Sequence, residues 1–373
     1  MALKRKRFRI IIIILLFIVY FFMAARPVKR EVVLEQKWIS SLTSSSLQGS
    51  QADNLLPFVL GSHFGYVDSS GVFAVNRVKT NDIALGQNMW TEYGAMPANI
   101  EIKNINEETI INIENAGGYP VLRDNRVFVL GSENNSLSEI NETGEIIWTY
   151  EFGSMLTCID ARAGLLLTGS LDGVIEVFSS AGERIFYFEP GGSRYAVILG
   201  CAISSDGSRI GIISGIDQQR FLLLERFGNS GGDYKVVYHE FLDAGFSRPV
   251  RILFVDDDRR IVYERTGGIN CYNMRTRRSV FIPLDGEIIA VEESGEQGFL
   301  FLVISHSSPE SLIEKKLVGV RFPQDRWFDI SRSSDAIFMS ALFKSDDVFL
   351  ARTGSSLIAG GGTTLVSFEL KEK

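Results

Sequence analysis

Histidine is the side chain best suited to acid–base catalysis near neutral pH, and the chain has three: His63, His239 and His306. They lie far apart in the sequence. None has a short-range partner of the kind that a metal site or a catalytic base uses. The sequence therefore predicts strand or surface histidines rather than catalytic or metal-binding ones.

Cysteine is the next candidate for chemistry, and the three cysteines are Cys158, Cys201 and Cys271. Each lies inside an apolar run such as MLTCID or VILGCAI. A metal site would need cysteines paired at short spacings, and these are absent. The pattern favours buried structural thiols, and it gives no information about the redox compartment.

Three consecutive carboxylates, Asp256, Asp257 and Asp258, could suggest a cation site. They stand between the apolar runs RILFV and IVYE, where acidic turn residues are common, and the EF-hand spacing is missing. The glycines at 191–192 and 360–362 are not phosphate loops, because no helix follows them. We predict no cofactor, no metal site and no catalytic residue, hence a protein that is not an enzyme.

Binding residues are then sought in loops that depart from the regular strand pattern. One such loop, GIDQQR, is polar and carries both signs of charge, and a second is the Gly-rich excursion FGNSGGDYK. Alternatively, the extra length of these two loops is tolerated and has no function. The candidate interaction residues in these loops are Asp217, Gln218, Gln219, Arg220, Asn229 and Asp233.

The stretch 165–189, LLLTGSLDGVIEVFSSAGERIFYFE, shows which elements carry these loops. Three short apolar runs are separated by Asp-Gly and Ala-Gly turns, a pattern typical of antiparallel hairpins. Similar units begin near residues 117, 153, 191, 248 and 287. Repeats of about 40–50 residues with four strands each are the signature of an all-β propeller, because one unit cannot bury its apolar face alone.

The repeat count predicts seven blades, each a four-stranded antiparallel sheet, with eight as the alternative if the hairpin at 58–79 stands alone. An open ring would leave bare strand edges. We therefore expect the hairpin at 58–79 to pair with the C-terminal strands at 348–370 and to close the ring.

The segments DGVIEVFSSAGERIFYF and TGEIIWTYEF resemble the recurring strand pair of WD40-like and quinoprotein-like (PQQ-repeat) propellers. More narrowly, the chain resembles uncharacterised membrane-anchored envelope propellers of bacteria such as spirochaetes. It is more distantly similar to the outer-membrane assembly propeller BamB, from which it departs in lacking a lipidation cysteine. The PQQ-dependent dehydrogenases use a pair of adjacent cysteines, which this chain does not have.

The N-terminus combines a basic tail, residues 1–9, with an uninterrupted apolar run, residues 10–25. A membrane-spanning helix needs about 17–25 residues, and the flanking arginines can extend the run. The positive-inside rule places the tail in the cytoplasm and the remaining chain on the exported side. A cleaved signal peptide is the alternative, although bulky residues such as Phe22 stand where small ones are expected.

These features predict a single-pass protein of the bacterial inner membrane with the propeller in the periplasm. Residues 26–54 are expected to be a juxtamembrane segment, helical near 27–42, followed by a flexible Ser-rich tether, and residues 55–373 to be the propeller. The net charge of -7 argues against a nucleic-acid partner. The leading hypothesis is a non-catalytic scaffold that binds an envelope protein, and the alternative is a small-ligand or sugar-binding sensor that uses the mouth of the propeller channel.

Overall fold

The computed structural model describes residues 13–17, 19–20, 32–43, 54–228, 233–242, 245–293, 298–307, 313–322, 337–343, 345–353 and 356–372. The chain forms two compact units, residues 1–35 with 370–373, and residues 36–369. In the first unit, residues 13–17 and 19–20 are helical. None of the helices in the described ranges is long and apolar enough to cross a membrane.

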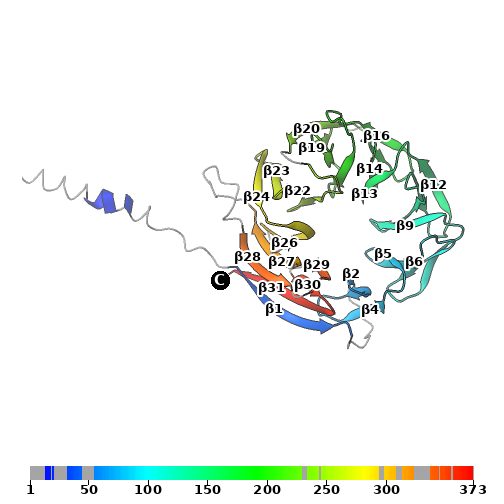
Figure 1. Cartoon of the computed structure of the whole chain (residues 1–373), viewed down its shortest axis with the longest axis horizontal. Coiled ribbons are helices and arrows are strands. Elements are labelled where there is room, and N and C mark those ends of the chain that lie inside the picture. The colour runs from blue at the N-terminus through cyan, green and yellow to red at the C-terminus, as the bar shows by residue number, and fades with distance from the viewer. Residues whose placement is uncertain are drawn as a thin grey trace, which may run out of the picture. The chain divides into compact units, whose positions relative to one another are not determined.

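The second unit is built from antiparallel sheets arranged as a ring (Figure 1). The described residues form eight sheets, seven with four strands and one with three. The first four sheets in chain order hold β2 (Leu56–Leu60), β3 (His63–Val67) and β4 (Phe73–Val78); β5 (Asp82–Leu85), β6 (Met89–Tyr93), β7 (Ile100–Asn104) and β8 (Thr109–Ile113); β9 (Gly118–Arg123), β10 (Arg126–Gly131), β11 (Ser136–Ile140) and β12 (Ile146–Glu151); and β13 (Leu156–Arg162), β14 (Leu165–Ser170), β15 (Ile175–Phe178) and β16 (Arg184–Phe188).

The other four sheets complete the ring. They hold β17 (Ile198–Ile203), β18 (Arg209–Ser214), β19 (Arg220–Arg226) and β20 (Tyr234–Phe241); β21 (Ile252–Val255), β22 (Arg260–Arg265), β23 (Gly268–Asn273) and β24 (Arg278–Pro283); β25 (Glu287–Glu293), β26 (Phe299–Ser307), β27 (Ile313–Arg321) and β28 (Ile337–Phe343); and β29 (Val348–Thr353), β30 (Ser356–Gly361), β31 (Thr364–Glu372) and β1 (Val32–Ser41). The fold is an eight-bladed β-propeller, so the prediction of seven blades is wrong and the alternative of eight is confirmed.

Glycine turns set the strand boundaries, as the stretch 165–189 shows. Gly173 donates its backbone N–H to Ser170 O at 3.2 Å, and Gly182 donates to Ser179 O at 3.0 Å. Both glycines have positive φ angles, 88° and 77°, which side chains with a Cβ rarely adopt. The three strands predicted from this stretch are β14, β15 and β16.

The hydrophobic core lies between neighbouring sheets, not inside a single sheet. One cluster joins Leu167 and Val177 to Ile210 and Leu222, which belong to the next sheet along the chain. Further clusters join the sheet of β17–β20 to that of β21–β24, and the latter to that of β25–β28. Each fully buried Leu, Ile or Val stabilises the fold by about 1.5–3 kcal/mol, so the blades support one another around the ring.

The ring closes through β1, and this differs from the sequence prediction. β1 lies next to β31 at the outside of the last sheet, and Leu42 donates its backbone N–H to Thr363 O at 2.8 Å. The predicted juxtamembrane helix near 27–42 is therefore wrong over residues 32–41. The hairpin at 58–79 does not pair with the C-terminal strands, because β3 and β4 form a separate sheet with β2. A run such as VVLEQKWISS suits an outer strand, since it mixes β-branched and aromatic residues with polar ones.

The ring has two faces that carry different loops. Because neighbouring strands are antiparallel, successive turns along a sheet lie at alternate ends of the strands. The first face carries two turns of each four-stranded sheet. One joins the first and second strands, and the other joins the third and fourth strands. The second face carries the turns between the second and third strands and the connections from one sheet to the next.

Candidate functional site

The residues predicted to form interaction loops are divided between the two faces. Asp217, Gln218 and Gln219 lie in the turn between β18 and β19, and Arg220 begins β19, so this group is on the second face. Asp233 precedes β20 and lies on the first face, where Phe227 donates its backbone N–H to Asp233 O at 2.6 Å. The seven residues of β19 separate the two turns by roughly 20 Å. Asn229 lies outside the described residues.

On the second face, Asp217 and Arg220 hold the connection between β16 and β17. The Asp217 carboxylate accepts hydrogen bonds from the Ser193 hydroxyl and from the Arg194 backbone N–H, the latter at 3.2 Å. The bond from Ser193 lowers the pKa of Asp217. The Arg220 guanidinium donates to the Gly191 carbonyl at 2.6 Å and to that of Pro190. These contacts fix a loop that has no regular secondary structure of its own.

Gln219 is buried, and its side-chain amide is hydrogen-bonded to the next connection, between β20 and β21. Its Nε2 donates to Gly215 O at 3.0 Å and to Phe246 O at 3.1 Å, and its Oε1 accepts the Phe246 N–H at 3.2 Å. A buried amide with three hydrogen bonds is well satisfied, so it rigidifies the backbone around it. Ile216, Asp217 and Gln218 are the exposed residues of this turn.

The turns and connections on the second face present apolar side chains to solvent. Four of these side chains, which we call the apolar rim, are Met155, Leu171, Tyr195 and Ile216, with exposed fractions of 45%, 50%, 61% and 38%. All four lie on the second face, in turns or connections of two neighbouring sheets. Exposed apolar groups on rigid loops are typical of protein-binding surfaces.

Backbone contacts show that three rim residues, Met155, Leu171 and Tyr195, are neighbours. Leu171 donates its N–H to Met155 O at 2.8 Å. The turn that carries Leu171 packs against the residue after Tyr195: a Cβ added at Gly173 would lie 2.7 Å from the Ala196 Cβ. Exposed polar residues surround the rim, including Asp172, Arg194 and Gln218. An apolar centre with a polar margin is the usual anatomy of an interface.

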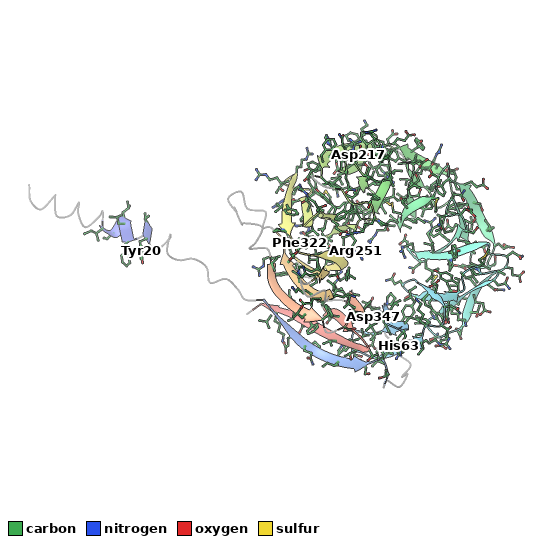
Figure 2. All side chains as sticks on the ribbon, viewed as in Figure 1. Tyr20, His63, Asp217, Arg251, Phe322 and Asp347 are labelled. Carbon is green, nitrogen blue, oxygen red and sulfur yellow. The ribbon has the colours of Figure 1, made fainter. Side chains whose placement is uncertain are left out.

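A hollow of about 440 Å³ lies at the inner strands of five consecutive sheets, and Figure 2 shows Arg251 at the inner margin of the ring. Residues from β9, β13, β17, the start of β21 and β25 line it, among them Arg123, Thr157, Leu199, Arg251 and Val291. Irregular pairing marks this wall, because β13, β17 and β25 each carry a β-bulge near their first residues. Bulges occur next to functional sites and also where a strand must bend.

The bulges are used to join one sheet to the next. Val250 donates its N–H to the carbonyl of Leu199 at 2.7 Å. Arg251 Nε donates to Ile288 O at 3.1 Å, and a second nitrogen of the same guanidinium bonds Ile289 O. Burial lowers the pKa of Arg251. The hollow is therefore bounded by backbone that is tied across sheets.

Two carboxyl groups on the inner strands have raised pKa values. Burial is the main cause for Asp160, whose carboxylate accepts the Ile203 N–H at 3.0 Å. Burial also raises the pKa of Glu292 to about 7, against the opposing effect of Arg352. Neither carboxyl group is among the residues that line the hollow.

The whole chain, residues 1–373, matches a protein family described as "beta-propeller protein". The chain belongs to this β-propeller family. It is 25% identical over 238 residues to an uncharacterized protein of Treponema pallidum (strain Nichols), a spirochaete. That match covers 64% of this chain and 62% of the relative, so the aligned part spans about three fifths of the relative's length.

Solved structures resemble the propeller in fold. BamB from Moraxella catarrhalis has a TM-score of 0.57 at 12% identity, covering 90% of this chain and 100% of that chain. The computationally designed Ika8 protein has a TM-score of 0.58 at 11% identity, covering 87% and 98%. The resemblance to propellers such as BamB is thereby confirmed for the fold.

The remaining residues singled out in the sequence lie in ordinary positions of this propeller. The acidic triplet is a turn, as predicted, with φ angles of 58°, 51° and 59°, and Asp256 forms ion pairs with Arg259 and Arg260 at 2.6 and 3.1 Å. His306 Nδ1 lies 3.3 Å from an Asp285 carboxylate oxygen. Among the described residues, no group of three His, Cys, Asp or Glu side chains could hold a metal ion.

The apolar rim was missed in the sequence because its members look like ordinary strand flanks. Met155 and Leu171 stand directly beside apolar strands, and nothing in a strand-and-turn pattern tells an exposed Leu from a buried one. The loop GIDQQR was visible because it is polar. The structure shows that Asp217, Gln219 and Arg220 hold the neighbouring backbone. The exposed apolar surface is formed by Ile216 of the same loop together with Met155, Leu171 and Tyr195.

Proposed function

We propose that this propeller is a non-catalytic scaffold, tethered to the bacterial inner membrane, that binds an envelope protein through the apolar rim. The rim is the observation that carries the proposal. Four exposed apolar side chains lie on the second face, and Asp217, Gln219 and Arg220 fix the loops that carry two of them, Tyr195 and Ile216. A rigid apolar surface binds with little loss of conformational entropy, and a tyrosine such as Tyr195 is a common energetic centre of such interfaces.

The tether is proposed from the N-terminal sequence. Five basic residues within 1–9 precede the apolar run 10–25, which favours a cytoplasmic tail and an exported propeller. A reporter that is active only in the cytoplasm, fused after Lys373, should then be silent. Mass spectrometry of the mature N-terminus should find the segment 1–25 retained, and a chain that begins after Ala25 would replace the anchor with a cleaved signal peptide.

The binding proposal is tested with matched surface variants of the full chain. Leu171→Ser and Tyr195→Ser together remove two apolar side chains of the rim, while Phe227→Ser removes one of similar exposure, 53%, from the first face. Cross-linking in cells, followed by purification in mild detergent, should recover one envelope protein with the wild type and with Phe227→Ser. The rim variant should lose it. Recovery with all three chains, or with none, would contradict the proposal.

A small-ligand or sugar-binding sensor is the second candidate, and the hollow at the inner strands favours it. Its volume of about 440 Å³ falls within the range of small-molecule sites. Thr157, Arg123 and Arg251 bring polar groups to its wall. A ligand that binds there should raise the melting temperature of the full chain, and Arg123→Ala should abolish the rise while the rim variant keeps it.

A further inference from the structure

Two of the three cysteines lie on neighbouring inner strands of the ring. Cys158 is on β13 and Cys201 is on β17, and these two strands lie side by side. Both residues line the hollow at the inner strands, and both are free thiols in this structure. Their spacing in the sequence gave no sign of this, because it is the ring that brings the strands together.

The register of the two strands sets the thiols opposite one another. The Asp160 carboxylate accepts the N–H of Ile203, a residue 43 positions further along the chain, at 3.0 Å. Side chains alternate along a strand, so the residues two places earlier on both strands, Cys158 and Cys201, point to the same side and are also 43 positions apart. Directly before Cys158, the Thr157 hydroxyl donates a hydrogen bond to the Ile198 carbonyl oxygen. Cys158 packs against the apolar cluster that contains Cys201, and its thiol contributes to the raised pKa of Cys201.

A glycine makes room for this arrangement. Gly169 on β14 is the cross-strand partner of Cys158. A Cβ at that position would lie only 2.6 Å from Cys158 Sγ and 2.5 Å from Ile198 Cγ2. The site is also open to small reagents on one side, since Cys158 is half-buried and both cysteines line the hollow.

We propose that Cys158 and Cys201 are a modification site: they form a reversible disulfide that joins two blades at the inner wall when they react with a small disulfide oxidant. The Cys158 thiolate attacks one sulfur of the oxidant, forms a mixed disulfide and releases one thiolate. The Cys201 thiolate then attacks Cys158 Sγ, forms the disulfide between the strands and releases the second thiolate. The two cysteines lose two electrons, the oxidant gains them, and the two thiol protons pass to the released thiolates or to water.

The reaction has a pH dependence that follows from the surroundings of the pair. Burial raises the pKa of Cys201, with a further contribution from the Cys158 thiol. The charge of Asp160 raises it as well, and two cationic side chains, Arg123 and Arg251, line the same hollow as the pair. The thiolate fraction therefore grows as the pH rises, and the second step should accelerate between pH 7 and pH 9.

The test uses the purified full chain in mild detergent, first reduced and then treated with oxidised glutathione. Thiol counting should fall from three to one, and peptide mapping should find one cross-linked pair that contains Cys158 and Cys201. Dithiothreitol should restore all three thiols. The oxidised chain should melt about 5 °C higher than the reduced chain, because the cross-link restrains the unfolded state.

Two serine variants serve as controls. Cys271 is buried on β23, in another sheet, so Cys271→Ser should form the same cross-link and show the same rise in melting temperature. Cys201→Ser should instead stop at a glutathione adduct on Cys158, without the rise. The proposal is overturned if the wild type keeps three thiols, or if it carries separate glutathione adducts on Cys158 and Cys201 in place of the cross-link.

Discussion

The indole nitrogen of Trp38 donates a hydrogen bond of 2.8 Å to the carbonyl oxygen of Ser69. Trp38 is on β1, the outer strand of the last sheet, and Ser69 lies in the turn between β3 and β4 of the next sheet. The indole covers Gly71 of that turn, where a Cβ would lie 2.7 Å from the ring. Trp148 on β12 covers Gly182 in the same way. The N-terminal strand thus repeats the contact by which one blade docks on the following blade.

Two N-terminal deletions, one that keeps β1 and one that removes it, should therefore give chains of different stability. A chain that lacks residues 1–31 keeps β1 and should unfold in one cooperative transition. A chain that lacks residues 1–43 loses the strand, exposes the edge of β31 and should aggregate or lose cooperativity. Thermal unfolding with light scattering measures both, and equal behaviour of the two chains would show that β1 does not close the ring.

The contact of Trp148 with Gly182 gives a prediction with a close control. Gly182 and Gly164 have similar φ angles, 77° and 72°, but a Cβ at Gly182 would lie 2.4 Å from the indole, whereas nothing lies within 4 Å of one at Gly164. Gly164→Ala should cost about 1 kcal/mol for the backbone alone. Gly182→Ala should cost about 2 kcal/mol more because the indole must move. Urea unfolding of the two variants compares them, and equal losses would rule out the steric contact.

These contacts also show how far the sequence predicts the fold. The Gly turns and apolar runs of 165–189 predict three strands correctly, because both signals are local. The blade count failed at 32–41, where VVLEQKWISS has no turn partner nearby and lies beside a run that resembles a membrane segment. Its partner strand is more than 300 residues away, and local patterns contain no information about pairing at that distance.

A buried ion pair between β10 and β11 should matter more for stability than an exposed one. Arg126 donates to both oxygens of Glu139, at 2.7 and 2.6 Å, and Trp148 Nε1 donates to the same carboxylate at 2.8 Å. Glu139→Gln leaves the Arg126 charge buried without its partner, and we expect a loss of about 3 kcal/mol in the free energy of unfolding.

The control for this prediction is the pair Arg209–Glu225, whose side chains are 30% and 36% exposed. Glu225→Gln should cost less than about 1 kcal/mol because solvent screens the pair. Urea unfolding gives both values. A smaller loss for Glu139→Gln than for Glu225→Gln would contradict the role of burial.

Glu292 should make the stability of the propeller depend on pH. Its pKa is raised to about 7 by burial, compared with about 4.3 in an unfolded chain. The folded state therefore holds a proton that the unfolded state has released, and the advantage present below pH 4 is lost as the pH rises through 7. The Glu292→Gln variant has no titratable carboxyl group at this position. We expect it to be more stable than the wild type by about 1–2 kcal/mol at pH 8, and equal to it at pH 4.

Urea unfolding at several pH values tests this expectation, because the other carboxyls titrate alike in both chains. A difference between Glu292→Gln and the wild type that stays constant from pH 4 to pH 8 would show that the carboxyl is not perturbed.

The candidate site was predictable only in part. The polar loop at 215–220 stands out in the sequence, and it does lie at the rim. The sequence does not reveal that Gln219 is buried, or that Arg220 turns back to the carbonyls of residues 190 and 191. The Gln219 contacts depend on the following connection, and the Arg220 contacts depend on the preceding one. The grouping of Met155, Leu171 and Tyr195 depends on how two blades pack, which follows from the closed ring.

The pairing of β1 with β31 also constrains the order of events during synthesis. The strand that completes the last sheet leaves the ribosome before the other strands of the ring, and its partner leaves after them. Until β31 is made, β1 has no neighbouring strand. Ring formation must wait for the complete chain, and contacts between such distant residues form slowly. A chain without β31 therefore exposes two unpaired strand edges, those of β1 and β30, to other chains, and a factor that shields them during this interval would increase the yield of folded protein.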